Sequence, residues 1–359
     1  MKKEKISKIK QLQDILSKKN IDVSIFLNFD ENKKDKTVYY FSDVEPEFSC
    51  LIIPKKGNPK LIVAKLEEEL TKKESKIRNV VLLEKDFFKQ LSRIIGKNKK
   101  IGLNFKTVSL SEKKLLSKHL KKSKFFDVSN DITDLRIQKT DDEIDKIRKA
   151  CKITDEIFSK IILNAKSFRN EKEIEELIEN EAKKNGCSLA FSPIVGSGKN
   201  SSMPHYKDNN SEIKKGFCVI DFGVRYQGYN SDITRTIYFG TPSEKEKEEY
   251  YRLLGVQEEA IKKIKVGEDF KKIDKAVRKV LGDSFIHSLG HGLGIDVHER
   301  VSTDNKRSLL KDGTILTVEP GVYHTSKFGI RIEDDVLVTK RGNEILTKSS
   351  KKLIIIKIT

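Results

Sequence analysis

The chain has 359 residues, of which 36% are hydrophobic and 35% are charged, and its formal net charge is +18. This length accommodates two domains with separate cores, and apolar residues recur periodically throughout, which excludes a disordered chain. No stretch approaches the roughly 20 apolar residues of a membrane-spanning helix, and the amphipathic N-terminus lacks the apolar core of a signal peptide. We therefore expect a globular, cytoplasmic protein without a membrane partner.

The excess of positive charge would suit a nucleic-acid partner, yet the lysines are spread along the whole chain and interleaved with glutamate. No basic run alternates with aromatic residues as in nucleic-acid recognition motifs. A lysine-rich, solvated surface explains the charge, so we expect no specific binding of nucleic acid. The cysteines, Cys50, Cys151, Cys187 and Cys218, form no CxxC pair, which indicates buried thiols in a reducing compartment.

Residues 1–131 alternate short β-rich runs with amphipathic helices, which predicts an N-terminal α/β domain. We expect its strands at residues 23–29, 38–41, 50–53, 61–64, 80–83, 101–104 and 125–128, and its helices at residues 3–18, 87–95 and 111–120. No residues of this region assemble a chemical site. The domain is therefore expected to serve in oligomerisation or in capping a site elsewhere in the chain.

The second expected domain, residues 132–359, begins within a junction at residues 131–139. Its first helix begins at the capping box formed by Thr140 and Glu143, and Asn170 caps its second helix. Two further helices are expected, one from Ser243 and one over residues 270–281.

Two distant stretches of this second domain each place a pair of acids on a predicted β-ribbon. Asp221 and Asp232 flank one turn, and Glu319 and Glu333 flank another. Because paired strands lie only about 4.8 Å apart, each turn brings its two acids together. Since helices precede each ribbon, we expect a pseudo-repeat whose halves both supply carboxylates to one shared centre.

Between the ribbons, residues 290–294 read Gly-His-Gly-Leu-Gly, which combines an imidazole with glycines that permit close approach of the backbone. A single aspartate near a hairpin is usually turn chemistry, but four converging carboxylates would repel one another unless cations neutralised them. Oxygen ligands with one imidazole favour Mn²⁺ or Co²⁺, with Fe²⁺ and Zn²⁺ as alternatives. The expected ligands of two divalent metal ions are Asp221, Asp232, His291, Glu319 and Glu333.

The same motifs resemble the signature of the pita-bread metallopeptidases, a family that includes methionine aminopeptidase, aminopeptidase P and prolidase. The similar runs, in chain order, are residues 221–223 with 229–236, residues 290–299, residues 319–323 and residues 331–334. The N-terminal α/β domain and the run Pro204-His205-Tyr206 resemble the proline-directed branch. The resemblance implies an α/β (α+β) chain in which a creatinase/prolidase-type domain precedes a pita-bread catalytic domain with pseudo-twofold symmetry.

The resemblance also implies metal-binding roles for the five expected ligands. Asp221 and Glu333 resemble carboxylates that bridge two ions. Asp232 resembles a ligand of one ion, and His291 and Glu319 resemble ligands of the other. All five positions of the family pattern are occupied in this chain, whereas relatives that work without metals have lost them.

Further residues match the family's substrate-handling positions. Glu319 is implied to accept and pass on a proton, and His298 to stabilise the developing oxyanion. His205 and His287 resemble residues that line the proline side and contact the product carboxylate. Tyr323 and Arg331 are implied to support the site or to contact substrate. The resemblance therefore suggests Glu319, His298 and His205 as catalytic residues and His205, His287, His298, Tyr323 and Arg331 as substrate-binding residues.

The implied activity is hydrolysis of Xaa-Pro bonds, whose proline nitrogen carries no hydrogen. The short segment between Glu319 and Glu333 lacks the longer insertion of some aminopeptidase P members and favours an Xaa-Pro dipeptidase (prolidase). An aminopeptidase P acting on longer peptides is the alternative. A catalytically inactive module that binds peptides or proteins is a third possibility, against which the intact ligands argue. The expected partners are proline-containing peptides and a second copy of the chain in a homodimer.

Overall fold

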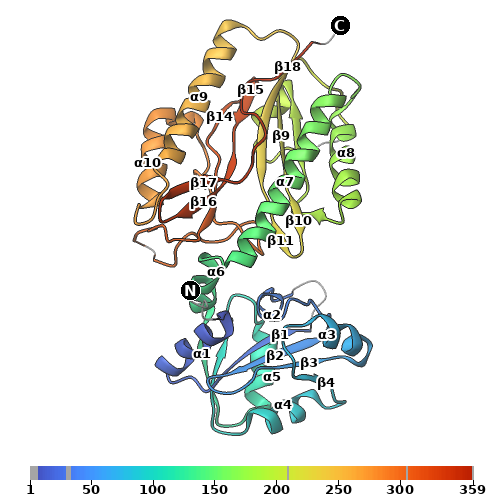
Figure 1. Ribbon diagram of the computed structural model, residues 1–359, viewed down its shortest axis with the longest axis vertical. Coiled ribbons are helices and arrows are strands. Elements are labelled where there is room, and N and C mark those ends of the chain that lie inside the picture. The colour runs from blue at the N-terminus through green and yellow to red at the C-terminus, as the bar shows by residue number, and fades with distance from the viewer. Residues whose placement is uncertain (1–6, 30–33, 208–209, 305, 358–359) are drawn as a thin grey trace. The chain divides into compact units, whose positions relative to one another are not determined.

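The structure is a computed structural model that describes residues 7–29, 34–207, 210–304 and 306–357. The chain divides into two compact units, residues 1–136 and 137–359 (Figure 1). The division falls at the end of helix α6 (Ser129–Ile137). Within the described ranges, no helix is both long enough and apolar enough to cross a membrane.

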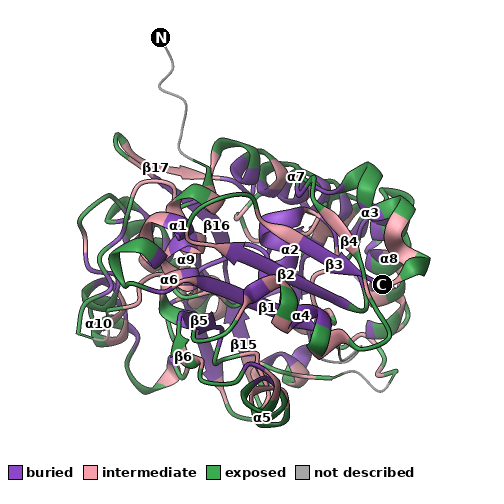
Figure 2. Cartoon of the chain, turned by 90° about the horizontal axis from the view of Figure 1, so that it is seen from below, coloured by how far each residue is buried: buried purple, intermediate pink, exposed green. Residues whose placement is uncertain are grey.

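The first unit is built around a six-stranded mixed sheet in the order β4-β3-β2-β1-β5-β6. Its strands are β1 (Val23–Asn28), β2 (Ser49–Pro54), β3 (Lys60–Val63), β4 (Val80–Leu82), β5 (Lys100–Leu103) and β6 (Lys124–Asp127). Its helices before α6 are α1 (Lys8–Lys18), α2 (Thr37–Ser42), η1 (Lys65–Glu67), α3 (Glu68–Glu74), α4 (Phe87–Ile95) and α5 (Leu110–His119). The central strands β1 and β2 are buried along almost their whole length (Figure 2).

One predicted strand of this unit is wrong, because residues 38–41 lie in helix α2. A short, continuous apolar run has no periodicity that separates a buried strand from a buried helix, and all four side chains are buried. The Asp35 carboxylate accepts a hydrogen bond from the Thr37 N–H at 2.9 Å, and Asp43 ends the helix with a left-handed φ of 63°. The other predicted elements coincide with observed ones to within one residue at each end, except that the first helix begins at Lys8 and residues 3–6 lie outside the described residues.

The second unit holds the predicted helices and both ribbons. Its helices are α7 (Asp141–Asn164), α8 (Glu171–Lys184), η2 (Gly198–Ser202), α9 (Glu244–Lys262), α10 (Phe270–Leu281) and η3 (Gly282–Ser284). Its strands are β7 (Ser188–Leu189), β8 (Ile194–Ser197), β9 (Gly216–Phe222), β10 (Val224–Tyr226), β11 (Tyr229–Asn230), β12 (Ile233–Phe239), β13 (Ile315–Val318), β14 (Gly321–His324), β15 (Phe328–Arg331), β16 (Asp334–Thr339), β17 (Gly342–Ile345) and β18 (Ile355–Ile356). The predicted caps Thr140, Asn170 and Ser243 each accept a backbone hydrogen bond at the start of their helix.

Two hydrophobic cores divide the second unit. Apolar side chains of α7 and α8 pack against β8, β9 and β12, whereas those of α9 and α10 pack against β13 to β16. In each half a pair of helices precedes an antiparallel ribbon, which agrees with the expected repeat (Figure 1). The first core packs under the ribbon of β9 and β12, which carries Asp221 and Asp232 and which we call the aspartate ribbon. The second packs under the ribbon of β13 to β16, which carries Glu319 and Glu333 and which we call the glutamate ribbon.

The four cysteines are all free and buried, as predicted. Burial raises the pKa of the Cys151 and Cys218 thiols well above their usual value. Cys218 therefore packs as an apolar side chain, whereas the Cys151 thiol donates a hydrogen bond to Asp335 Oδ2 at 3.3 Å.

Candidate metal centre

The aspartate ribbon places its two acids on one face. Asp221 on β9 lies opposite Thr234 on β12, and Asp232 precedes Thr234 by two residues, so both acids project to the same side. The ribbon bends at Gly223, where a Cβ atom would lie only 1.9 Å from the Ser231 carbonyl oxygen. Only glycine therefore allows the return strand to approach this closely.

The glutamate ribbon brings its acids together by register. The β13–β16 and β14–β15 ladders share one register, in which Gly321 pairs with Arg331. The same register places Glu319 opposite Glu333, between the Gly321–Arg331 pair and the Val318–Asp334 pair. The Glu333 N–H donates to the Thr234 carbonyl oxygen at 3.1 Å, so the second ribbon is joined directly to the first.

The glycine-rich loop runs along strand β13 and delivers His291 to the acids. The His291 N–H donates to Thr317 Oγ1 at 3.0 Å, and its carbonyl oxygen accepts from the Thr317 N–H at 2.8 Å. A Cβ atom on Gly290 would lie 2.0 Å from the Thr317 carbonyl oxygen. Gly292 forms two backbone hydrogen bonds with Glu299, of 2.9 and 2.8 Å, and these close the loop.

A buried ion pair anchors this loop. Lys139 Nζ lies 3.1 Å from Glu299 Oε2, and the two side chains are only 1% and 6% exposed. Glu299 Oε1 also accepts from the Asp296 N–H at 3.3 Å. Since removing either charge would leave the other buried without its partner, the pair holds the segment that carries both His291 and His298.

The imidazole of His291 presents a lone pair to the carboxylates. Its Nδ1 lies 3.1 Å from the Gly292 carbonyl oxygen, which can only accept, so Nδ1 carries the hydrogen and Nε2 is unprotonated in the neutral ring. Nε2 lies 3.3 Å from Glu319 Oε1 and 3.7 Å from Asp232 Oδ2. Burial, followed by the charge of His298, lowers the pKa of His291 to about 4. Once both carboxyl groups are ionised, these facing atoms are all acceptors, an arrangement that a cation between them would stabilise.

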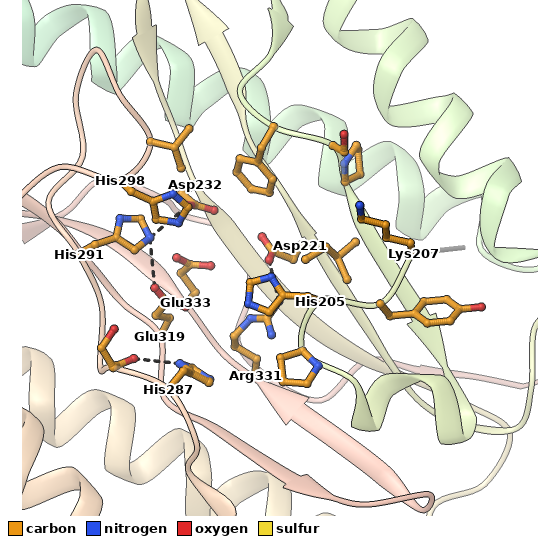
Figure 3. A pocket seen from close by; sticks show the side chains of 18 residues that line it. His205, Lys207, Asp221, Asp232, His287, His291, His298, Glu319, Arg331 and Glu333 are labelled. Atoms are coloured by element: carbon orange, nitrogen blue, oxygen red, sulfur yellow. Dashed lines mark hydrogen bonds and ion pairs between the residues drawn. The ribbon is translucent and has the colours of Figure 1, made fainter. Parts of the chain in front are cut away.

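Two carboxylate oxygens of the expected ligands lack hydrogen-bond partners among the described residues, which also fits a metal centre. Asp221 Oδ1 and Asp232 Oδ1 are buried and have no hydrogen-bond partner among the described residues. One ligand atom each from Asp232, His291 and Glu333 lies within 4.8 Å of the other two, and Figure 3 places Asp221 and Glu319 beside them. The structure thus brings together all five expected ligands, and their donor atoms suit divalent ions.

Crowding of negative charge disturbs the titration of these acids. Burial, followed by the charge of Glu333, raises the pKa of Asp232 well above its usual value. Burial, followed by the charge of Glu319, does the same for Glu333, and burial raises the pKa of Glu319 to about 7. Bound cations would offset both the burial and the repulsion.

These shifts predict a pH dependence of stability that metal removal reveals. A carboxyl group whose pKa is higher in the folded protein contributes stability below its unfolded pKa, about 4.5 for Glu319, and loses it as the pH rises through about 7. We therefore expect the melting temperature of chelator-treated protein to fall between pH 4.5 and 7 relative to that of Mn²⁺-loaded protein. Calorimetry of both forms across this pH range measures the difference in melting temperature, and Glu319→Gln should reduce it. Melting temperatures of the two forms that change in parallel with pH would contradict the prediction.

A cavity of about 420 Å³ opens onto the four acids and His291 (Figure 3). Of the residues predicted to handle substrate, His205, His287, His298 and Arg331 line this cavity. Tyr323 lies behind the wall, where its hydroxyl group is 3.0 Å from His287 Nε2 and 2.7 Å from an Arg331 guanidinium nitrogen. The remaining lining residues are Phe191, Ser192, Pro193, Ile194, Pro204, Tyr206, Lys207, Ser288 and Val297.

Arg331 connects both ribbons at the wall of the cavity. Its guanidinium group donates to Asp221 Oδ2 at 2.6 Å, to Tyr323 Oη at 2.7 Å and to Thr234 Oγ1 at 3.0 Å. Thr234 in turn donates to Glu333 Oε2 at 2.6 Å. Arg331 is therefore placed to orient Asp221 directly and Glu333 through Thr234.

Sequence reasoning missed several supporting residues. Thr317 donates to Glu319 Oε1 at 3.0 Å as well as binding the His291 loop, although nothing but its strand position marks it in the sequence. Asp335 accepts the Asp232 N–H at 2.9 Å. The sequence did contain a signal for Asp335. Residues 333–335 are three consecutive acids, and a role had been predicted for Glu333 alone.

Comparison with known proteins agrees with this geometry. The pattern of Metallopeptidase family M24 matches residues 145–340, and that of the Creatinase/Prolidase N-terminal domain matches residues 8–138. The chain is 37% identical over 341 residues to the Xaa-Pro dipeptidase of Pyrococcus furiosus, and this match covers 90% of this chain and 97% of that protein.

Solved structures match over nearly the whole chain. The prolidase from Pyrococcus horikoshii OT3 superposes with a TM-score of 0.86 at 35% identity, covering 97% of this chain and 99% of that chain. The X-Pro aminopeptidase from Thermotoga maritima MSB8 gives a TM-score of 0.87 at 33% identity, covering 94% and 98%. Both branches of proline-directed activity therefore occur among proteins similar to this one.

The fold and the carboxylate-rich centre are those of a metal-dependent peptidase. The chain belongs to metallopeptidase family M24, with a creatinase/prolidase-type N-terminal domain and a pita-bread catalytic domain. The predicted family and fold class are thereby confirmed, and membership of this family implies divalent metal ions as cofactors.

Proposed function

We propose that this protein hydrolyses Xaa-Pro peptide bonds and that Xaa-Pro dipeptides are its substrates. The observation that carries the proposal is the convergence of Asp221, Asp232, His291, Glu319 and Glu333 on one cavity. The similarity to an Xaa-Pro dipeptidase over 97% of that protein's length supports the substrate class.

Asp221, Asp232, His291, Glu319 and Glu333 would hold two divalent ions. Ions bound there would acidify a water molecule and polarise the scissile carbonyl group. Four carboxylates and one imidazole favour Mn²⁺ or Co²⁺. Metal analysis of the purified protein, by mass spectrometry of the bound ions, tests this preference.

The chain's own residues would handle the protons and the developing charge. Glu319, half-buried at the cavity wall with one oxygen bonded to Thr317, would accept a proton from the attacking water and pass it to the leaving proline nitrogen. His298, whose side chain is exposed in the cavity, would donate a hydrogen bond to the oxyanion.

The proline side of the substrate would lie between two histidines. His205 and His287 both line the cavity (Figure 3). Burial, followed by the charge of Arg331, lowers the pKa of His287 to about 4, so its ring is neutral at pH 7. Its Nδ1 donates to the Ser288 carbonyl oxygen at 2.9 Å, which leaves Nε2 to accept from the Tyr323 hydroxyl group. This fixed ring would give the proline an apolar face.

A direct assay separates the two proline-directed activities. With Mn²⁺ present, we expect hydrolysis of Xaa-Pro dipeptides, slower cleavage of Xaa-Pro-Yaa tripeptides, and no cleavage of Xaa-Ala dipeptides. Chelation should abolish the activity and Mn²⁺ should restore it. Faster tripeptide cleavage would identify an aminopeptidase P, and tight peptide binding without hydrolysis would identify an inactive binding module.

We also propose that the protein works in the cytoplasm as a homodimer in which the N-terminal unit serves assembly or capping of the site. Free, buried thiols suit a reducing compartment. Light scattering after size-exclusion chromatography of the full chain tests the dimer; a monomer with full dipeptidase activity would contradict it.

A further inference from the structure

The segment that carries His287 has no regular structure of its own. The structure assigns no helix or strand to residues 285–290, which join η3 to the His291 loop. His287 and Ser288 nevertheless line the cavity. The backbone groups of such a segment need partners from elsewhere, because buried unpaired groups are costly.

Helix α10 supplies these partners from two side chains one turn apart. The guanidinium group of Arg278 donates to the carbonyl oxygens of Phe285 at 2.8 Å and His287 at 2.6 Å. The carboxylate of Asp274 accepts the N–H of Leu289 at 2.8 Å. Together Asp274 and Arg278, which we call the α10 clamp, bond to three of the five residues from 285 to 289.

The clamp is held together by its own charges and by ring packing. Arg278 lies 3.5 Å from Asp274 Oδ1. The guanidinium carbon also lies 4.6 Å from the centre of the Phe285 ring, whose centre is 5.1 Å from that of His287. A planar guanidinium group can donate to two carbonyls while stacking on a ring, which a lysine ammonium group cannot reproduce.

The clamped segment contacts two parts of the site. His287 is bonded through Nε2 to Tyr323, and the Leu289 carbonyl oxygen accepts the N–H of Glu319 at 2.8 Å. A shift of the segment would therefore move the proline-side histidine first and would loosen the backbone of Glu319.

We infer that Asp274 and Arg278 are positioning residues that lower the KM for the Xaa-Pro substrate by fixing His287 in the cavity wall. The inference rests on the proposed Xaa-Pro hydrolysis. Neither side chain is among the residues that line the cavity, so the clamp acts through the backbone of residues 285–289. A misplaced His287 would contact the proline less well in the ground state and in the transition state alike, and a loss of such uniform binding raises KM more than it lowers kcat.

The test compares Arg278→Met with Arg252→Met in the Mn²⁺-loaded full chain. Arg252, on α9, is a matched control because it is also 43% exposed and also pairs with an acid of its own helix, Glu249, at 2.9 Å. We expect Arg278→Met to raise the KM for an Xaa-Pro dipeptide by about tenfold, with a smaller change in kcat and unchanged metal content. Arg278→Lys should recover only part of the loss, and Arg252→Met should behave as wild type.

A double-mutant cycle identifies the route of the effect. In a His287→Ala background, Arg278→Met should add little further loss; a full additional loss would overturn the assignment to His287. An Arg278→Met protein that is folded and has the wild-type KM would overturn the clamp. If Arg278→Met is insoluble, Arg278→Lys serves in the same comparisons.

Hydrogen exchange provides a readout independent of activity. Arg278→Met should speed exchange of the Leu289 amide relative to Arg252→Met, and unchanged exchange would overturn the inference. Wild-type protein that cleaves no Xaa-Pro peptide would instead refute the proposed function, while this exchange measurement still decides whether the clamp holds the segment.

Discussion

Asp232→Asn is expected to lower kcat for Xaa-Pro hydrolysis by roughly 100-fold or more while the protein stays folded, since a metal contact supplies several kcal/mol of charge stabilisation. Asparagine keeps the shape of the side chain but removes one of four clustered charges. It should therefore weaken one metal site and leave one ion per chain instead of two. The backbone N–H of residue 232 would still donate to Asp335, which keeps the bend of the ribbon.

The measurements are kcat, bound metal per chain and melting temperature. Since burial raises the pKa of Asp232, removing its carboxyl group should not lower the melting temperature of chelator-treated protein at pH 7. Asp145→Asn, on an exposed part of α7 where the carboxylate pairs with solvent-facing Arg148, is the control. Full activity, or two tightly bound ions, would refute the assignment of Asp232.

Motifs and register made the convergence of the four acids predictable from the sequence. Alternation along a strand fixes which side chains share a face, so Asp221 with Asp232, and Glu319 with Glu333, could be paired from their turns. The glycines around His291 indicated close backbone approach, and the structure shows why, because the Thr317 carbonyl oxygen occupies the space of a side chain at Gly290.

What the sequence could not supply were contacts between distant residues and the structure of short apolar runs. Lys139 and Glu299 are 160 positions apart, and no sequence motif connects the two positions. Arg278 looks like any basic residue near the end of an amphipathic helix, although its partners are backbone carbonyls that no side-chain pattern reports. The run at residues 38–41 lacked periodicity, so only packing could decide between strand and helix.

His298→Ala is expected to lower kcat about 100-fold while both metal ions stay bound. The ring lies at the cavity wall with its centre 4.3 Å from that of His291, yet His298 is not one of the clustered ligands. Loss of one hydrogen-bond donor to a developing oxyanion costs about this much, whereas the KM should change less because the ground-state carbonyl carries little charge.

The control for this variant is His324→Ala, which removes a half-exposed histidine that pairs with Glu249 at 3.5 Å outside the cavity lining. It should leave kcat and metal content unchanged. If His298→Ala instead releases an ion, the residue acts by packing against His291 and not on the substrate. If turnover is unchanged with both ions bound, the oxyanion needs no donor from this loop, and the buried Lys139–Glu299 pair then serves only to hold His291.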